Sequence, residues 1–400
     1  MTQAIPGGRH RFEALDSWRG LCALLVAVHH FYLSSQPVLP GASIVSSFFM
    51  FVDFFFVLSG FVIAYTYQDK IQTKAKLIEF MIRRFGRVWP LHAVVMLIFI
   101  AFFGITRFLP HPANLTPLTH GGTYAIGKIP TILALLNSFG LHSGGWNLPS
   151  WSIGAEFYTY ILFGLLMLLG ARSNLSIALV AAAGFAALLL VSSEYINATA
   201  NFGFFRCIYG FFLGVLTFRA FATRNLASGG PSPVMGTCLE ILTVAAAGIF
   251  LYFSTNGFYT ANSMSLAAPP VLACVIWVFA AETGAISTVL KTWPAQFLGR
   301  LSYSIYINHW LVLSVIGYIF WLHAYSIGGS FYTDVAQWGG IYQIMNFETA
   351  GKSYLVLSVY IPMVVIISYF TYKYIELPGQ SKAKAIAAHV TQASPAMSTP

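Results

Sequence analysis

Charged residues are scarce in this sequence of 400 residues. Asp, Glu, Lys and Arg together make up 8% of the chain, whereas hydrophobic residues make up 57% and the mean hydropathy is +0.72. A soluble domain contains about one quarter charged residues, so the composition excludes an ordinary soluble protein. It predicts a chain that crosses a membrane several times.

Cysteine is also rare. The four cysteines lie within or at the edges of apolar segments, and they show no CxxC or paired spacing: Cys22, Cys207, Cys238 and Cys274. This pattern predicts neither a zinc site nor a disulfide framework. We therefore expect no bound metal.

Basic residues exceed acidic ones, which gives a formal net charge of +9. The cations form short clusters beside apolar runs and do not follow one solvated face, so we expect no binding of nucleic acid. If the N-terminus is cytoplasmic, seventeen of the 21 Lys and Arg residues fall on the cytoplasmic side. This bias follows the positive-inside rule and predicts that both termini are cytoplasmic.

Apolar runs near the spanning length of about 20 residues recur along the chain. We place ten membrane helices at 21–33, 48–67, 88–106, 152–170, 175–193, 202–218, 238–254, 265–281, 301–320 and 353–372. The fold class predicted is all-α, a polytopic membrane helical bundle. The apolar run at 129–142 is too short to span and is expected to be a re-entrant or interfacial helix.

The chain is expected to form one transmembrane domain over residues 1–380. No small-residue cleavage pattern follows the first apolar run, which favours a retained first span over a cleaved signal peptide. Residues 381–400 are rich in Ala, Ser, Lys and Pro. They are expected to form a disordered cytoplasmic tail.

Two ionisable residues share one face of the first predicted helix. Eleven residues at about 100° each bring Arg19 and His30 to within about 20° of each other, about 16 Å apart along the axis. His29 lies about 80° from that face. Ionisable groups at membrane depth are costly and indicate either a function or pairing inside the bundle. We interpret His30 as functional, with a structural histidine near the outer interface as the alternative.

Three arginines stand together before the third predicted span, in the stretch RRFGRVWPLH: Arg83, Arg84 and Arg87. Arginine offers planar, forked donors to phosphate oxygens, so the cluster is a candidate phosphate site. A cluster at this place can also act as an orientation anchor that binds anionic lipid heads. The spacing leaves both readings open.

A third polar group opens the fourth predicted span. Ser152 and Glu156 are four residues apart and therefore neighbours on one helical face. A carboxylate about one turn into the bilayer needs a partner, and His30 reaches the same depth from the other side. Trp151 alone would be an interfacial aromatic residue.

Further polar side chains occur in later spans. We expect them to line a cavity or to join helices by hydrogen bonds: Arg206, Tyr306 and His309. For Arg206, pairing with a carboxylate is the structural alternative.

Six stretches occur in a characteristic order: LDSWRGLCALLVAVHHF, FFFVLSGFVIAY, RRFGRVWPLH, WSIGAEFYTYILFG, LGRLSYSIYINHW and YKYIELP. Together they closely resemble the acyltransferase-3 family of integral membrane O-acyltransferases, which modify envelope polysaccharides, lipopolysaccharide, peptidoglycan and some secondary metabolites. The resemblance covers about residues 12–380. It implies a ten-span domain that moves an acyl group, usually acetyl, from cytoplasmic acyl-coenzyme A to a hydroxyl, commonly outside the cytoplasm.

The resemblance also implies roles for single residues. The arginine and histidine of the family's first motif match Arg19 and His30, its arginine-rich motif matches residues 83, 84 and 87, and its tryptophan–serine–glutamate motif matches residues 151, 152 and 156. The sequence departs from the usual pattern at Ser17, Trp18, His92 and Phe157. These departures bear on the acceptor more than on the chemistry.

These observations lead to a hypothesis for the mechanism. The 16 Å between Arg19 and His30, an estimate from about 1.5 Å per residue, is comparable to the reach of a pantetheine arm. The arginines would hold the coenzyme A phosphates, His30 would act as the base, and Glu156 would orient it or serve as a second base. Direct transfer and a covalent acyl-enzyme on His30, Ser152 or Tyr306 both remain open.

We expect a protein of the bacterial cytoplasmic (inner) membrane with a carbohydrate or glycolipid acceptor. A secondary transporter that exports a lipid or sugar is the alternative function, because transporters also carry polar residues near the middle of the membrane.

Overall fold

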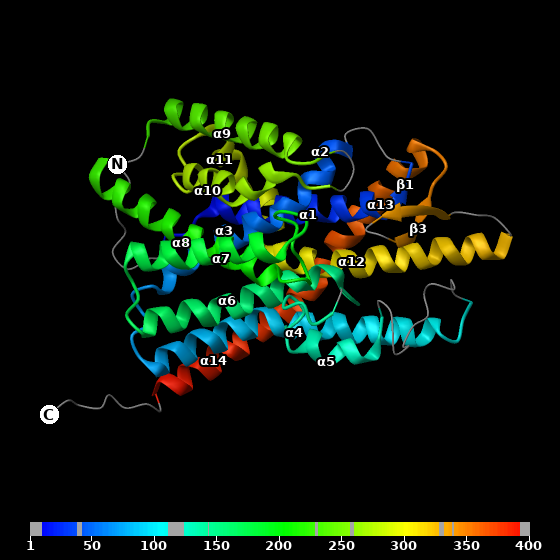
Figure 1. Cartoon of the computed structure of the whole chain (residues 1–400), viewed down its shortest axis with the longest axis horizontal. Helices are drawn as coiled ribbons and strands as arrows, with labels where there is room; N and C mark the ends of the chain where they lie inside the picture. Colours follow the sequence, from blue (N-terminus) through cyan, green and yellow to red (C-terminus); the bar gives the residue numbers. More distant parts are fainter. Residues whose placement is uncertain are drawn as a thin grey trace.

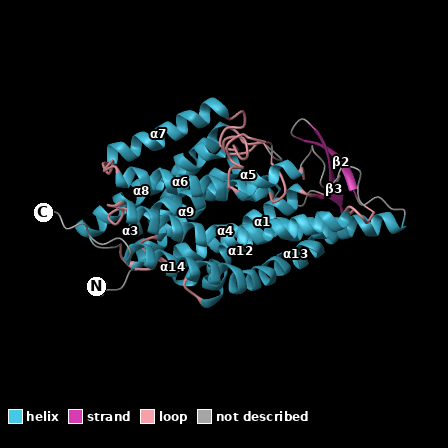
Figure 2. Cartoon of the chain, turned by 90° about the horizontal axis from the view of Figure 1, so that it is seen from below, coloured by secondary structure: helices cyan, strands magenta, loops and turns pink. Residues whose placement is uncertain are grey.

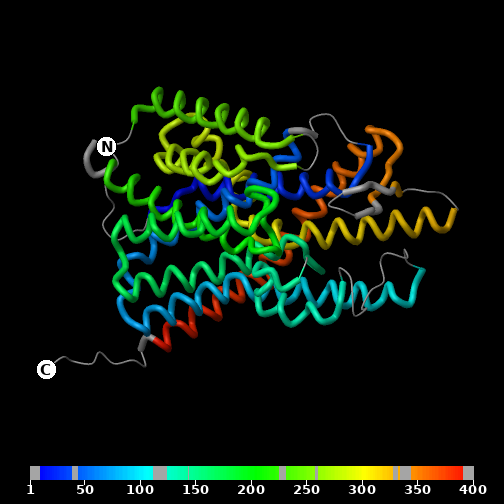
Figure 3. The backbone as a smooth tube through the Cα atoms, in the orientation of Figure 1, coloured from blue at the N-terminus to red at the C-terminus, as the bar shows by residue number. Residues whose placement is uncertain are grey.

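The computed structural model describes residues 10–37, 42–110, 124–142, 144–228, 231–256, 260–327, 332–337 and 340–392. Most helices run along the long dimension of the molecule (Figure 1). The first helix, α1 (Glu13–Leu33), begins at the same end of the bundle at which the last helix, α14 (Leu377–Gln392), finishes (Figure 3). The described chain therefore starts and ends on one side, as a bundle with both termini on one side of the membrane requires.

All ten ranges predicted to span the membrane are helical. After α1 they correspond to α3 (Phe51–Tyr67), α4 (Lys74–Thr106), α6 (Trp151–Leu168), α7 (Asn174–Val191), α8 (Gly203–Ser228), α9 (Pro233–Phe253), α10 (Ala268–Phe279), α12 (Trp293–Ile327) and α13 (Ala350–Thr371). Short helices precede or join them: α2 (Ala42–Ser46), η1 (Ser47–Met50), η3 (Leu148–Ser150), η4 (Ser263–Ala267) and α11 (Ala285–Leu290).

Eight helical segments in the described part of the chain are long and apolar enough to cross a membrane. The remaining two predicted spans are α1, which carries Glu13, Asp16 and Arg19 in its first two turns, and α10, which has 12 residues and follows η4 without a break. The structure thus confirms a polytopic helical membrane protein.

The segment 129–142 does not form a spanning helix. It follows η2 (Ile126–Lys128), begins with the short helix α5 (Ile129–Leu133) and continues as turns. Two side chains of α4 hold the end of α5, because Trp89 Nε1 donates to Leu133 O at 3.0 Å and His92 Nε2 lies 3.0 Å from Ile132 O. The segment is therefore fixed against the flank of α4.

The expectation of a disordered tail from residue 381 is wrong for its first part. α13 continues through a π-helical turn, η5 (Tyr372–Glu376), into α14. α14 packs along α4 through small residues: a Cβ added to Gly86 would lie 2.0 Å from Ala383 Cβ. The Ala-rich composition that suggested disorder instead permits this close packing. Residues 393–400 lie outside the described residues.

A three-stranded sheet, which the sequence did not predict, lies at the end of the bundle away from the chain ends (Figure 2). Its strands are β1 (Ser35–Gln36), β2 (Tyr332–Gln337) and β3 (Gly340–Asn346), in the order β1-β3-β2. β1 pairs parallel with β3, and β2 pairs antiparallel with it. Because β1 directly follows α1, the sheet connects the end of that helix to the segment after α12.

Two helix pairs approach so closely that glycine is required at their contacts. A Cβ on Gly20 of α1 would lie 2.4 Å from the backbone of Leu298 on α12, and one on Gly299 would lie 2.5 Å from Asp16 O. In the pair α3 and α8, the corresponding distances are 1.8 Å from Gly60 to Phe211 O and 1.9 Å from Gly214 to Val57 O. Small residues at such contacts let backbones meet inside a membrane.

Gly60→Ala and Gly214→Ala are each expected to destabilise the protein by about 1–3 kcal/mol, because overpacking at a backbone contact forces the two helices apart. The measurement is thermal unfolding of the purified protein in detergent. Gly248→Ala on α9 is the matched control, because a Cβ there would meet nothing within 4 Å. Equal unfolding temperatures for all three variants would contradict the packing described here.

Candidate active site

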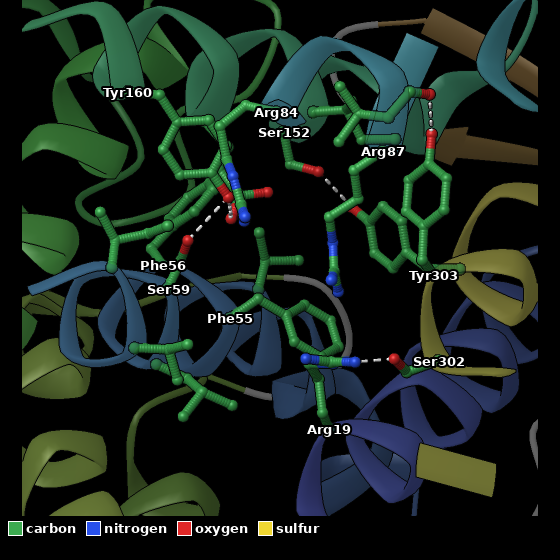
Figure 4. A pocket seen from close by; sticks show the side chains of 18 residues that line it. Arg19, Phe55, Phe56, Ser59, Arg84, Arg87, Ser152, Tyr160, Ser302 and Tyr303 are labelled. Carbon is green, nitrogen blue, oxygen red and sulfur yellow. Dashed lines mark hydrogen bonds between the residues drawn. The ribbon is translucent and has the colours of Figure 1, made fainter. Parts of the chain in front are cut away.

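A pocket of about 820 Å³, including the space at its mouth, lies inside the bundle between α1, α3, α4, α6 and α12. Six of the predicted site residues line it: Arg19, Arg84, Arg87, Ser152, Glu156 and Tyr306. The labelled arginines point toward a common space from two helices, Arg19 from α1 and both Arg84 and Arg87 from α4 (Figure 4). One wall is apolar and comes from a single face of α3: Val52, Phe55, Phe56, Leu58, Val62 and Ile63.

Arg19 enters the pocket from α1 and is held by α12. Its Nε donates to Ser302 Oγ at 2.8 Å and its Nη2 to Gly299 O at 3.4 Å. Its Nη1 lies 3.6 Å from an oxygen of Asp16. Arg19 is therefore fixed in position and partly neutralised.

The three arginines of α4 have different environments. Arg83 pairs with Glu79 at 2.9 Å and does not line the pocket. Arg84 lies over the Tyr67 ring, donates to the Tyr67 hydroxyl at 3.3 Å, and leaves its buried Nε without a partner. Arg87 makes no hydrogen bond or ion pair with any residue that the structure describes. The predicted cluster thus separates into one neutralised cation and two that face the pocket.

Hydroxyl groups join α6 to its neighbours on the pocket wall. Ser152 Oγ and Tyr306 Oη are 2.7 Å apart, and both also lie within hydrogen-bond distance of Pro149 O, at 3.1 and 3.0 Å. One turn further along α6, Glu156 accepts a hydrogen bond from Tyr160 Oη at 2.5 Å, and that hydroxyl lies 2.9 Å from Ser59 Oγ. Ser152 and Glu156 thus line the same pocket, as their spacing on α6 predicted, and the hydrogen-bond partner of Glu156 is Tyr160.

His30 does not line the pocket and does not contact Glu156. Its Nδ1 lies 3.2 Å from Nε2 of His309, which is fully buried. Tyr306 lines the pocket, and its ring centroid is 5.8 Å from that of His309. Tyr306 is therefore a lining residue of the pocket that also packs against the histidine pair. The expected pairing of His30 with Glu156 is wrong, because His30 contacts α12 while Glu156 faces Tyr160.

His29 faces away from this site, as the helical angle predicted. Its Nδ1 lies 2.9 Å from Val45 O, on α2, and the side chain is buried. Its ring also packs against Phe49, with the ring centroids 6.2 Å apart. These contacts give it a structural role.

Arg206 is also absent from the pocket wall. It forms a two-point ion pair with Asp53 at 2.7 and 2.8 Å, and the side chains are 1% and 0% exposed. Its guanidinium also lies over the Trp151 ring, 5.5 Å from the ring centroid. Arg206 is thus paired with a carboxylate, as the structural alternative predicted. Trp151 lines a smaller, separate pocket together with Asn137 and His142.

The residues that line the pocket but were not among the site residues predicted from the sequence include Tyr160, Ser302 and Tyr303. Tyr160 follows Glu156 by four residues, and this helical spacing could have identified it. Ser302 and Tyr303 belong to the polar stretch of α12, but nothing local in that stretch distinguishes them as lining residues. Among the described residues, no cluster of three or more His, Cys, Asp or Glu side chains has the arrangement of a metal site.

Comparisons with known proteins agree with this architecture. A family model described as an acyltransferase domain matches residues 12–375. The chain is 31% identical over 162 residues to acyltransferase MdmB of Streptomyces mycarofaciens, a match that covers 39% of this chain and 39% of that protein. It is 28% identical over 202 residues to protein 2 in the picA locus of Rhizobium radiobacter, covering 48% and 98% respectively. No solved structure matches.

Arg206→Met is expected to lower the stability by about 3–5 kcal/mol, because it leaves the Asp53 carboxylate buried without a partner. The double variant Arg206→Met with Asp53→Leu should recover part of the loss, since no unpaired charge remains. Thermal unfolding in detergent measures both. A fully stable Arg206→Met protein that binds substrate poorly would instead place Arg206 in substrate binding.

Proposed function

The chain belongs to the acyltransferase-3 family, and from this premise we propose that it is a membrane O-acyltransferase that takes an acetyl group from cytoplasmic acyl-coenzyme A. The acceptor proposed is a hydroxyl of an envelope polysaccharide, glycolipid or related glycoside at the bacterial inner membrane. The observation that carries the proposal is the pocket in which three guanidinium groups, an apolar wall and a pair of hydroxyls meet.

The pocket is chemically suited to coenzyme A. Guanidinium groups form strong, forked hydrogen bonds with phosphate oxygens, and Arg87 has no hydrogen bond or ion pair to a described residue that such an oxygen would have to replace. Arg84 and Arg19 supply further positive charge on the same cavity. The apolar face of α3 provides the surroundings that the alkyl parts of a pantetheine arm require. These features support a donor site with its phosphates on the arginines.

Acyl transfer to an alcohol needs a base for the hydroxyl proton and donors for the oxyanion. We assign His30 as the base and the hydroxyls of Ser152 and Tyr306 as candidate oxyanion donors. Ser152 contacts Tyr306 and Pro149 O, and neither group is a base that could activate a serine nucleophile. This favours direct transfer from the thioester to the acceptor over an acyl-serine intermediate.

The assay uses the purified protein in liposomes with radiolabelled acetyl-coenzyme A and a glycan fraction from the cell envelope. We expect release of free thiol that depends on the glycan, together with labelled glycan. Movement of the glycan across the membrane without thiol release would instead support the transporter alternative.

His30→Ala should lower the rate of transfer by about 10²–10⁴, the usual contribution of a general base. His29→Ala is the matched control on the same helix, because the one hydrogen bond of its side chain in the described part of the chain is to the backbone of Val45. A tolerated His30→Ala change combined with an inactive, folded His29→Ala protein would contradict the assignment of the base.

Arg87→Gln should weaken acetyl-coenzyme A binding about 10- to 100-fold, as expected for a lost charge-assisted hydrogen bond of about 1.5–3 kcal/mol. Arg83→Gln should change it by less than about twofold, because Arg83 is already paired with Glu79. Donor affinity is measured by titration calorimetry. Equal losses in the two variants, or an inverted topology with normal affinity, would favour the lipid-anchor interpretation.

A further inference from the structure

The imidazoles of His30 and His309 meet across the contact between α1 and α12. His30 Nδ1 lies 3.0 Å from Val26 O and 3.2 Å from His309 Nε2, and the ring centroids are 4.9 Å apart. His309 Nδ1 lies 3.3 Å from Ile305 O. Two imidazoles and two backbone carbonyls therefore form one continuous chain of contacts.

The carbonyls determine which nitrogens carry protons. A carbonyl oxygen only accepts hydrogen bonds, so His309 carries its proton on Nδ1, which donates to Ile305 O. Its Nε2 is then an acceptor. His30 Nδ1 faces two acceptors, Val26 O and His309 Nε2, and must therefore be protonated. The free lone pair of His30 is on Nε2.

The two histidines differ in access. His309 is fully buried and both of its nitrogens are engaged. His30 is partly exposed, and its Nε2 has no hydrogen-bond partner in the described part of the chain and is not sealed from solvent. His30 is thus the imidazole that can reach an acceptor, and His309 can act only through it.

We propose that His309 is a positioning residue that holds His30 in the Nδ1-protonated tautomer and stabilises the imidazolium formed during acyl transfer. This inference rests on the proposed function. The acceptor oxygen forms a bond to the acyl carbon and gives its proton to His30 Nε2. The Nδ1 proton is then shared with His309 Nε2, and the carbon–sulfur bond breaks. The proton on His30 passes to the departing thiolate, which restores the neutral pair.

In a serine hydrolase, a carboxylate accepts the hydrogen bond from the catalytic histidine. Here the neutral imidazole of His309 occupies that position beside His30. The titratable side chains nearest the pair are His29 on α1, Tyr306 on α12 and Tyr360 on α13, whose hydroxyl donates to His309 O at 3.1 Å. No carboxylate or guanidinium that the structure describes bonds to either imidazole. A neutral acceptor favours the imidazolium less than a carboxylate does, so His30 stays neutral, and able to act as a base, over a wider range of pH.

The test compares His309→Gln with His309→Met, using acetyl transfer from radiolabelled acetyl-coenzyme A to the envelope glycan fraction. Glutamine keeps an acceptor for His30 Nδ1, and methionine has a similar volume but no such acceptor. We expect kcat to fall about 10- to 100-fold in the Met variant, less than when a triad carboxylate is lost, with an unchanged KM for the donor. The Gln variant should recover at least half of this loss on a logarithmic scale.

The dependence of kcat on pH gives a second readout, which a purely structural residue would not alter. Without an acceptor at position 309 the imidazolium of His30 is less stable, so the acidic limb of the profile should move to lower pH in the Met variant and return in the Gln variant. His29→Met is the matched control and should leave the profile unchanged. If His309→Met does not fold, His309→Ala takes its place, since the smaller side chain cannot clash.

A folded Met or Ala variant with wild-type kcat and an unaltered pH profile would overturn the proposal. So would a Gln variant as inactive as the Met variant, because the acceptor would then be irrelevant. Either result, with the His30→Ala enzyme still inactive, leaves the acyltransferase function intact. Absence of thiol release from the wild-type protein would instead refute the proposed function itself.

Discussion

The backbone contact between α1 and α12 is the constraint on which the rest of the site depends. Gly20 and Gly299 bring the two helices together, and the polar residues of both helices then face each other along the contact. Near the start of α1, Arg19 donates a hydrogen bond to Ser302, and further along the same faces His30 contacts His309. A separation of the helices by one methyl group would break both contacts at once. The register of a single helix pair thus fixes the distance between the cationic pocket and the histidines.

Several other charged side chains in the described part of the bundle are paired or hydrogen-bonded. Asp53 neutralises Arg206, Glu79 pairs with Arg83, and Glu240 accepts hydrogen bonds from the backbone of Gly284 and Ser287. Ionisable groups in a membrane persist when they are paired or functional. Against this background, Arg87 differs from the structural cations of the bundle, because it has neither a hydrogen bond nor an ion pair with any residue in the described ranges. This is the feature of the pocket that supports the proposed anionic ligand.

The sequence predicts what local periodicity determines. Helical spacing predicts the ten spanning ranges, the shared face of Arg19 and His30 and the separate direction of His29. It also predicts that Ser152 and Glu156 lie on one face of α6. It does not predict partnerships between distant helices. His30 finds His309 and Arg206 finds Asp53 because of how α1, α3, α8 and α12 pack, which no local pattern encodes. The same limit explains the error at α14. Its Ala-rich composition indicated disorder, because the sequence does not show that α4 is there to pack against it.

The most direct test of the account is a structure of the purified protein bound to coenzyme A. The account predicts that the phosphates lie against Arg84 and Arg87, that the pantetheine arm follows the apolar face of α3, and that the sulfur lies near Ser152 and Tyr306. Coenzyme A bound elsewhere, with a lipid headgroup on the arginines of the pocket, would contradict it.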